Sequence, residues 1–389
     1  MHRLRKISGI LHLWIGLITG IVILLVSLSG CLLVFEEPLF NLIHPGLVYT
    51  PAAGGSTRPL SALTATAQKA LGPGKPVNTI TIYPDPDRSF VFGASGSGKN
   101  HSTHRTAFDQ VDYLDEVYVD PYTGKVLGQI DRKHEFFTVL LWLHRYLLLY
   151  PSVGRPIVGI STLLFLVLLL TGVVLWFPRN RGARKQRFRI LLRARWRRVN
   201  YDLHATGGFY VLLLGAVMAV TGLTWSFKWW ESGIYRLLGT DRPLSVKREQ
   251  LPVASRPAAD IRPLDIAMRS VYGKAPRFEQ ISIDLPQKAN QPIMAIVQVS
   301  SGTGWRVVDY YYYHSITGQL TGQFLQGDKS LGQKWRNTNL YIHTGNVYGL
   351  PGQILAFLAS LVCASLPLTG FLVWYGRKNK EKKRRAAIL

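Results

Sequence analysis

The stretch Leu11-His12-Leu13-Trp14-Ile15-Gly16 opens the first long apolar run of the chain. Leu203-His204, followed by Gly208, opens a later apolar run with the same spacing of four from histidine to glycine. Two further histidines precede apolar runs, in Leu143-His144-Arg145-Tyr146 and in Ile342-His343-Thr344-Gly345. Four of the ten histidines therefore stand at the start of long apolar segments, which makes them the candidate functional residues.

The apolar residues are concentrated in four runs, Ile10–Phe35, Pro156–Phe177, Gly207–Phe227 and Leu350–Tyr375. Each run of roughly 21 to 26 residues is long enough to cross about 30 Å of hydrocarbon. Buried helices of a soluble enzyme are seldom so long and so free of charge. The sequence therefore predicts an integral membrane protein, with the lipid bilayer as its surroundings.

The net charge of +24 would suggest nucleic acid if it were spread over a surface, but it is not. Residues 179–198 hold ten Lys/Arg and no acid, and the tail from Arg377 holds seven against one Glu. Because Lys and Arg in short loops mark the cytosolic side, the N-terminus, this loop and the tail are predicted inside. The two long polar segments are predicted outside, and a nucleic-acid partner is excluded.

The first apolar run is predicted to remain as a membrane anchor. It is too long for a signal peptide, and no clear small-x-small cleavage site follows it. Cys31 and Cys363 fall inside apolar runs. They are predicted to be packing residues rather than a disulfide.

The two outside segments repeat one order of elements. Each is predicted to begin with a short helix, 62–71 or 262–271, and the hairpin of residues 122–129 matches 316–323. The predicted strands are Asn78–Tyr83, Ser89–Phe92, Val117–Asp120 and Val126–Gln129 in the first segment, with a Gly/Ser-rich insertion at 93–98, and Phe278–Asp284, Ile293–Val299 and Trp305–Tyr313 in the second.

The membrane helices repeat as well. Ser29-Gly30 corresponds to Thr221-Gly222 at the same offset as His12 to His204, and Thr171-Gly172 corresponds to Thr369-Gly370. The chain thus contains two copies of one unit, in which an outside domain lies between two membrane helices. The copies form a parallel repeat about an axis along the membrane normal. We expect a membrane four-helix bundle with internal duplication and two α+β outside domains.

The predicted boundaries are membrane helix 1 at 1–35, outside domain 1 at 36–141, membrane helix 2 at 142–178, a basic cytosolic loop at 179–202, membrane helix 3 at 203–229, outside domain 2 at 230–341, membrane helix 4 at 342–376 and a basic cytosolic tail at 377–389.

The repeat converts four histidines into two pairs. His12 and His204 are equivalent at the cytosolic depth, and His144 and His343 are equivalent at the outer depth. A haem iron with two axial imidazoles on the pseudo-twofold axis matches this arrangement, and a helix bundle holds such a cofactor in its core. The sequence thus predicts two bis-histidine haem b groups, one near each membrane face, roughly 20 Å apart across the bilayer.

Simpler interpretations remain for these residues. A single histidine at a membrane boundary is as often an interfacial residue bonded to a carbonyl or water as it is a haem ligand. Gly16 and Gly208 leave room for a flat macrocycle, whereas Gly16 with Gly20 equally suits close helix packing. Zinc or copper is disfavoured because histidines at opposite faces cannot reach one ion.

Several other residues have weaker predicted roles. His44 and His134 are alternative outer ligands or substrate contacts. His101 and His104 are expected to be solvated, and His314 to have ordinary packing. The aromatic residues near the membrane boundaries are predicted interfacial anchors: Trp142, Tyr146, Tyr150, Trp176 and Trp374.

The Leu-His-x-Trp-x-Gly stretch at 11–16, the other three histidine stretches and the Thr-Gly…Trp endings of the second and fourth runs resemble the PepSY-associated transmembrane family. The outside segments resemble PepSY domains, whose late hairpin carries Asp-x-x-Thr-Gly. The first copy has Asp120, whereas the second has His314 in its place and lacks that carboxylate. The resemblance covers nearly the whole chain.

This resemblance implies a haem-containing ferric-siderophore (ferrioxamine) reductase of the bacterial inner membrane, with periplasmic outside domains and the family's motif histidines at His12, His144, His204 and His343. Electrons would enter at the His12/His204 haem from a cytosolic or quinone donor and leave from the His144/His343 haem to a ferric siderophore. The iron would be released as Fe(II), because hard oxygen ligands hold Fe(II) less tightly than Fe(III). Residues 310–313, four tyrosines, either line that substrate site or belong to a sheet face. The alternatives are a quinone-linked cytochrome b-type carrier with another acceptor, or a non-enzymatic peptide-binding sensor.

Overall fold

The computed structural model describes residues 2–51, 54–97, 105–178, 184–240, 262–288, 290–299 and 306–386. The chain divides into two compact units. The helical unit comprises Met1–Phe35, Leu140–Glu231 and Leu340–Leu389, and the sheet unit comprises Glu36–Val139 and Ser232–Asn339.

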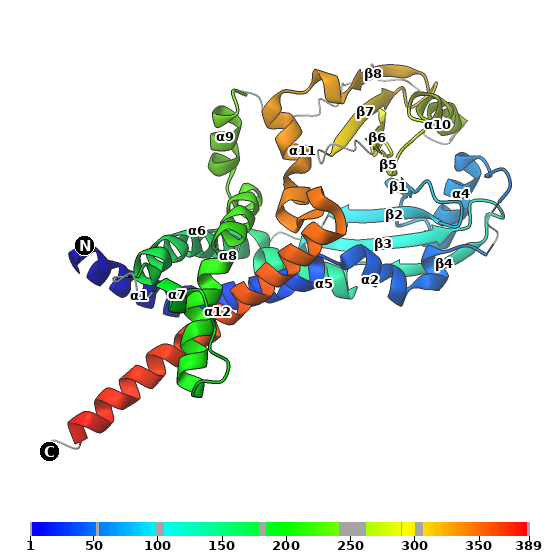
Figure 1. The fold of residues 1–389 in the computed structure, drawn as a ribbon. Coiled ribbons are helices and arrows are strands. Elements are labelled where there is room, and N and C mark those ends of the chain that lie inside the picture. Colours follow the sequence, from blue (N-terminus) through cyan, green and yellow to red (C-terminus); the bar gives the residue numbers. More distant parts are fainter. Residues whose placement is uncertain are drawn as a thin grey trace. The chain divides into compact units, whose positions relative to one another are not determined.

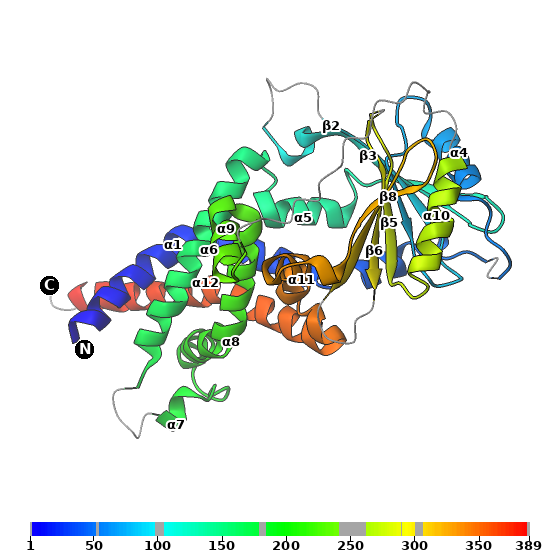
Figure 2. The same cartoon turned by 90° about the horizontal axis from the view of Figure 1, so that it is seen from above.

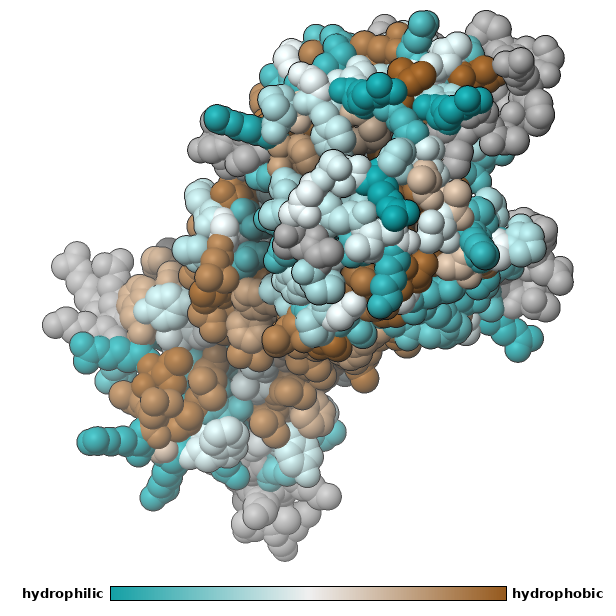
Figure 3. Space-filling view, turned by 90° about the vertical axis from the view of Figure 1, so that its right-hand side faces the viewer, coloured by the Kyte–Doolittle hydropathy of each residue, from teal (hydrophilic) through white to brown (hydrophobic). Residues whose placement is uncertain are grey.

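The helical unit is built from four long helices, α1 (His2–Leu33), α6 (Pro151–Trp176), α8 (Trp196–Ser226) and α12 (Gly349–Ala386). Each contains a segment long and apolar enough to cross a membrane, as predicted. Large apolar side chains such as Ile18 remain exposed along these helices, as expected of a surface that contacts lipid. In Figure 3 brown, hydrophobic side chains gather in a broad zone apart from the teal, hydrophilic ones.

The four long helices pack side by side. Helix α1 contacts α6 and α12, and α8 contacts the same two helices (Figure 1). Close approach is possible where side chains are small: Gly9 of α1 lies against Leu175, and Gly20 lies against Pro367. Gly16 of α1 lies against Leu168, earlier in α6 than Leu175, so α1 and α6 run antiparallel.

Residues 142–178 were predicted as one membrane helix, but they contain two. Helix α5 (Phe136–Tyr146) ends before α6 begins at Pro151. Leu147 and Leu148 adopt the left-handed φ values of 56° and 59°, which interrupt the helix and cost about 1 kcal/mol or more for a side chain with a Cβ.

A similar break precedes α12. Helix α11 (Leu331–Thr344) ends at Gly345, whose φ is 77°, and a short 3-10 turn, η4 (Asn346–Tyr348), follows. A Cβ at Gly345 would lie 2.2 Å from the carbonyl oxygen of Gly352, so this turn requires glycine. His144 and His343 therefore stand near the C-terminal ends of separate helices, not inside the long ones.

The sheet unit contains one antiparallel sheet of eight strands in the order β4-β3-β2-β1-β5-β6-β7-β8. The strands are β1 (Thr79–Ile82), β2 (Phe90–Ser97), β3 (Val111–Val119), β4 (Val126–Asp131), β5 (Gln280–Asp284), β6 (Ile293–Val299), β7 (Val307–Tyr313) and β8 (Leu320–Phe324). Helices α4 (Leu60–Leu71) and α10 (Arg262–Lys274) lie against one face of the sheet, where the largest hydrophobic cluster forms (Figure 2).

The two polar segments were expected as separate domains, but they share one sheet and one core. Strand β1 pairs with β5 from Thr79↔Asp284 to Ile82↔Ile281. Each strand would otherwise be an edge with unpaired backbone groups, and pairing them satisfies both. Ser61 of α4 also bonds to Asp265 of α10 through its backbone N–H, at 2.9 Å.

The Gly/Ser-rich insertion at 93–98 was predicted as a break between strands, yet β2 continues through it to Ser97. A Cβ at Gly93 would lie 2.3 Å from the Thr79 hydroxyl, and one at Gly96 would lie 2.5 Å from the Tyr113 ring. Glycine is thus needed for contact between neighbouring strands. Composition alone suggested a loop.

The four tyrosines of β7 are all buried. Tyr311 and Tyr313 belong to the core beneath α4 and α10, while Tyr310 and Tyr312 pack with Met294 and Val308 in a separate cluster. They are residues of a sheet covered on both faces and do not line an open substrate site. The remaining short helices are α2 (Glu36–Ile43), α3 (Pro45–Val48), α7 (Arg184–Arg187) and α9 (Lys228–Leu237).

Candidate cofactor-binding site

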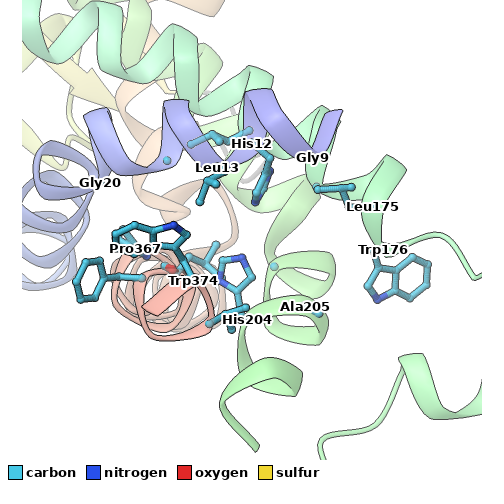
Figure 4. A pocket seen from close by; sticks show the side chains of 18 of the residues that line it. Gly9, His12, Leu13, Gly20, Leu175, Trp176, His204, Ala205, Pro367 and Trp374 are labelled. Atoms are coloured by element: carbon cyan, nitrogen blue, oxygen red, sulfur yellow. Dashed lines mark hydrogen bonds between the residues drawn. The ribbon is translucent and has the colours of Figure 1, made fainter. Parts of the chain in front are cut away.

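The inner histidine pair is formed by His12 of α1 and His204 of α8. Their ring centroids lie 6.0 Å apart and their ring planes are inclined by 82°. In Figure 4 the two imidazoles project from their helices toward the same space. The helices that carry them are the first and third long helices of the chain, so this pair forms only in the folded protein.

The outer histidine pair has nearly the same geometry. His144 of α5 and His343 of α11 have ring centroids 6.2 Å apart and planes inclined by 73°. The indole of Trp225 lies 5.5 Å from the His343 ring, edge to face. The structure therefore brings together the same two pairs that the sequence repeat predicted.

Each inner imidazole is held by a threonine from another long helix. The Nδ1 atom of His12 lies 3.0 Å from the Thr171 hydroxyl of α6. The Nδ1 atom of His204 lies 3.1 Å from the Thr369 hydroxyl of α12 and 3.1 Å from the Leu366 carbonyl.

The outer imidazoles are held in the same way. The Nδ1 atom of His144 lies 2.8 Å from the Val26 carbonyl and 3.2 Å from the Ser29 hydroxyl of α1. The Nδ1 atom of His343 lies 2.9 Å from the Thr221 hydroxyl of α8. In all four cases Nδ1 is the bonded nitrogen, which leaves Nε2 on the other side of the ring.

A glycine follows each of these hydroxyl residues and lies against the same ring. A Cβ on it would meet the imidazole Cε1 at 3.2 to 3.4 Å in three cases and at 2.9 Å in the fourth. The pairs are Gly30 with His144 (3.2 Å), Gly172 with His12 (3.4 Å), Gly222 with His343 (3.3 Å) and Gly370 with His204 (2.9 Å).

A cavity of about 690 Å³ surrounds the inner pair. Its volume lies within the roughly 300–1,000 Å³ typical of cofactor and ligand sites. Gly16 and Gly208, which the sequence suggested as space for a macrocycle, both line it, as does Gly20. Its lining is mostly apolar, with three basic residues: Arg5, Arg377 and Lys378.

The spacing of each pair fits a metal held between two Nε2 atoms. Two metal–nitrogen bonds of about 2 Å and the two ring radii bring coaxial imidazole centroids to roughly 6 Å. The observed separations are 6.0 and 6.2 Å. Among the described residues no group of three or more His, Cys, Asp or Glu could hold a metal ion. Each histidine pair supplies two imidazoles, the number of axial positions of a haem iron.

The two pairs lie at different depths along the long helices. His12 belongs to α1, and the outer His144 contacts Ser29 of the same helix. His204 and Thr221 repeat this arrangement on α8. At about 1.5 Å per residue, the rise between positions 12 and 29 is about 25 Å, close to the thickness of the hydrocarbon layer.

The other predicted histidines have different surroundings. The His44 ring lies 4.6 Å from that of Phe40, and His134 bonds to Asp131 through Nδ1 at 2.7 Å. Both belong to the sheet unit, and the ring that lies near His144 is that of His343. His101 and His104 lie outside the described residues.

His314 was expected to have ordinary packing, but it has a defined role in a hairpin. Its Nδ1 accepts the backbone N–H of Ile316 at 3.2 Å. In the first copy Asp120 accepts the N–H of Tyr122 at 2.8 Å in the same way. The histidine therefore replaces the carboxylate as a turn acceptor.

Three of the aromatic residues expected as interfacial anchors are buried instead: Trp142, Tyr146 and Trp176. Trp176 lines the inner cavity and stacks on Phe209 at 3.8 Å. Cys31 and Cys363 are free and buried, in keeping with the predicted packing role.

A comparison with protein families matches residues 10–377 to the family described as PepSY-associated TM region. The chain belongs to this family. The match to the PepSY-associated TM region includes all four paired histidines and the four glycines behind them. A comparison with curated proteins gives no match.

In the sequence the Ser/Thr-Gly steps are visible only as marks of duplication. The roles of Ser29, Thr171, Thr221 and Thr369 as partners of the histidines were not predicted. A signal was present, because Ser29 and Thr221 each lie 17 residues after a histidine, and Thr171 and Thr369 lie 27 and 26 residues after one. Which histidine each one contacts depends on helix packing, which the spacing alone does not give.

Proposed function

We propose that this protein is an electron-transferring oxidoreductase of the bacterial inner membrane, a di-haem ferric-siderophore reductase. The observation that carries the proposal is the presence of two imidazole pairs, with centroids 6.0 and 6.2 Å apart. Their positions along α1 and α8 differ by about 25 Å. Such pairs at two depths suit electron transfer across the bilayer.

In this proposal His12 and His204 hold one haem b, and His144 and His343 hold the other. Haem iron with both axial positions taken by imidazole exchanges single electrons and offers dioxygen no open position. Gly16, Gly20 and Gly208 leave the inner cavity wide enough for a flat group. Arg5, Arg377 and Lys378 supply positive charge for the carboxylates of such a group.

The proposed reaction transfers one electron from a cytosolic or quinone donor to a ferric siderophore on the outer side. The donor is oxidised and Fe(III) becomes Fe(II). Hydroxamate and catecholate oxygens are hard ligands that hold the softer Fe(II) less tightly, so reduction releases the metal. The protein itself forms no covalent bond in this reaction.

The proposed orientation places both termini and the 179–202 loop in the cytosol and the sheet unit in the periplasm. The support is the ten Lys/Arg of residues 179–198 and the basic tail, which are typical of cytosolic segments. We also propose that the chain is an internal duplication with two PepSY-like halves. The symmetric strand order about β1 and β5 and the four matching histidine contacts support this.

The experiment compares acceptors. The purified protein, reduced with dithionite and freed of excess reductant, is mixed rapidly with a ferric hydroxamate, a cupric chelate or a disulfide while its absorption is followed. We expect oxidation by the ferric chelate, with Fe(II) captured by ferrozine, and a large loss of this reaction in His343→Ala but not in His134→Ala.

Two results would point elsewhere. Oxidation only by the cupric chelate or the disulfide would favour a cytochrome b-type carrier with another acceptor. A colourless protein with no haem would favour a peptide-binding or sensor role and would contradict the reductase proposal.

A further inference from the structure

The four histidine contacts follow one pattern. Each imidazole Nδ1 meets a Ser or Thr hydroxyl, and each Cε1 meets the glycine that follows that hydroxyl residue. The pattern joins α1 with α5, α6 with α1, α8 with α11, and α12 with α8. It holds every paired histidine from two sides of its ring.

The hydroxyl protons are already used within their own helices. Ser29, Thr171, Thr221 and Thr369 donate to the carbonyls four residues earlier, at distances of 2.7, 2.8, 2.6 and 2.9 Å. A hydroxyl has one proton, and a carbonyl has none to give. The imidazole must therefore be the donor, so that Nδ1 carries the proton and Nε2 keeps its lone pair.

The rotation of the ring is fixed by the same contacts. The hydroxyl defines the direction of Nδ1, and the missing Cβ of the glycine admits the Cε1 edge. Since the four steps stand on different helices, the two rings of a pair are set independently. The resulting inclinations are 82° for the inner pair and 73° for the outer pair.

We propose that the four Ser/Thr-Gly steps are positioning residues that set both the tautomer and the rotation of the paired imidazoles. They present two Nε2 lone pairs to a shared metal with nearly perpendicular ring planes. Hydrogen-bond partners of this kind fix ring orientation and raise ligand basicity at histidine–metal sites. The inference deepens the proposed function, because it rests on the iron porphyrin assigned there to each pair.

The plane angle has a spectroscopic consequence. Perpendicular axial imidazoles direct their π overlap at two different iron d orbitals and leave these close in energy. Ferric low-spin iron then gives a highly anisotropic electron paramagnetic resonance signal at unusually low field. Parallel planes separate the orbitals and give the ordinary rhombic signal.

The test uses two steps, one at each pair. In Gly370→Ala the new Cβ would lie 2.9 Å from Cε1 of His204, so that ring must turn. Gly207→Ala is the matched control on α8, because its Cβ meets only the Val362 methyl, at 3.5 Å. Thr221→Val removes the hydroxyl from His343, and Thr221→Ser restores it. Thr162→Val is the control, because it removes a hydroxyl that donates to the Val158 carbonyl of its own helix, at 2.8 Å.

We expect two strongly anisotropic signals in the wild type. Gly370→Ala should shift the signal of the inner pair toward the rhombic form and spare the outer one, whereas Thr221→Val should do the reverse and raise the midpoint potential of the outer centre. Thr221→Ser and both controls should keep the wild-type spectrum. Unchanged signals in both test variants, with haem content retained, would overturn the proposal.

A second readout keeps the positioning role separate from the proposed function. The nitrogen-15 spectrum of histidine-labelled protein reports which ring nitrogen carries the proton. If the protein as purified contains no haem, the reductase proposal fails, yet four Nδ1–H imidazoles would still support positioning. Nε2–H imidazoles in that protein would overturn it.

Discussion

The imidazole of His12 lies with its centroid 6.0 Å from that of His204, and the two ring planes are inclined by 82°. The two imidazoles are too far apart and too steeply inclined to stack on each other. Both residues line the same cavity of about 690 Å³. Two imidazoles with Nδ1 bonded elsewhere and a shared space between them have the geometry that axial ligation of a metal requires.

Removing one histidine should abolish one haem and leave the other. His204→Ala leaves His12 without its partner, whereas the outer pair draws its residues from α5 and α11. We expect the haem content to fall from about two per chain to about one, measured by the pyridine haemochrome assay. The same result is expected for His12→Ala. A folded variant that loses both haems would contradict the assignment. So would the finding that His12→Ala and His144→Ala perturb the same haem.

Filling the inner cavity should exclude only the inner cofactor. Gly16 lines the cavity, so Gly16→Leu adds a side chain into it. Haem content should again fall to about one per chain, with the outer spectrum unchanged. The control is Ile18→Phe on the same helix, where the side chain is 72% exposed and has room to grow. Full haem content in Gly16→Leu would show that the cavity is not the binding space.

The basic residues of the inner cavity should tune its midpoint potential. Arg377 and Lys378 both line the cavity, and positive charge nearby favours the reduced state of a redox centre. In the double variant Arg377→Gln, Lys378→Gln we expect a lower potential for the inner centre in a spectroelectrochemical titration. The control is Lys6→Gln, because Lys6 is exposed and does not line the cavity. Equal potentials in the wild type and the double variant would contradict this role.

Burial lowers the pKa of Lys329 in the sheet unit to about 8. Its side chain lies over the rings of Tyr310 and Phe324, at 4.8 and 5.5 Å, and the residue is 4% exposed. The pKa of lysine in the unfolded chain is about 10.4. Between about pH 8 and about pH 10.4 the unfolded chain therefore binds more protons than the folded protein does, and the free energy of unfolding should rise with pH by at most about 3 kcal/mol.

The measurement is the apparent Tm of the wild type and of Lys329→Met at pH 7.5 and 9.5. We expect the wild type to gain stability relative to the variant as the pH rises. The opposite trend, or none, would mean that the ammonium group is well accommodated at neutral pH.

Hydrophobicity and charge were sufficient to predict the membrane helices, because a span of apolar residues has few other stable environments. The family membership predicted from the histidine stretches is confirmed by the match to residues 10–377. Strand Ile293–Val299 was predicted with its observed bounds. These features depend on local sequence, which explains why they could be predicted.

Other features depend on contacts between distant segments. The pairing of Thr79 with Asp284 joins two segments that looked like separate domains, and nothing in either strand specifies that partner. The break at Leu147 and Leu148 was missed because two leucines favour continuing a helix, yet the turn places them at positive φ. The contact of Thr171 with His12 likewise arises only when α1 packs on α6.

The most direct test of the central claim is the stoichiometry and coordination of haem in the purified full-length protein. We predict about two haems per chain, with six-coordinate low-spin spectra in both oxidation states and no change on adding carbon monoxide, because both axial positions are filled. A protein without haem, or a haem that binds carbon monoxide readily, would contradict the paired-histidine account.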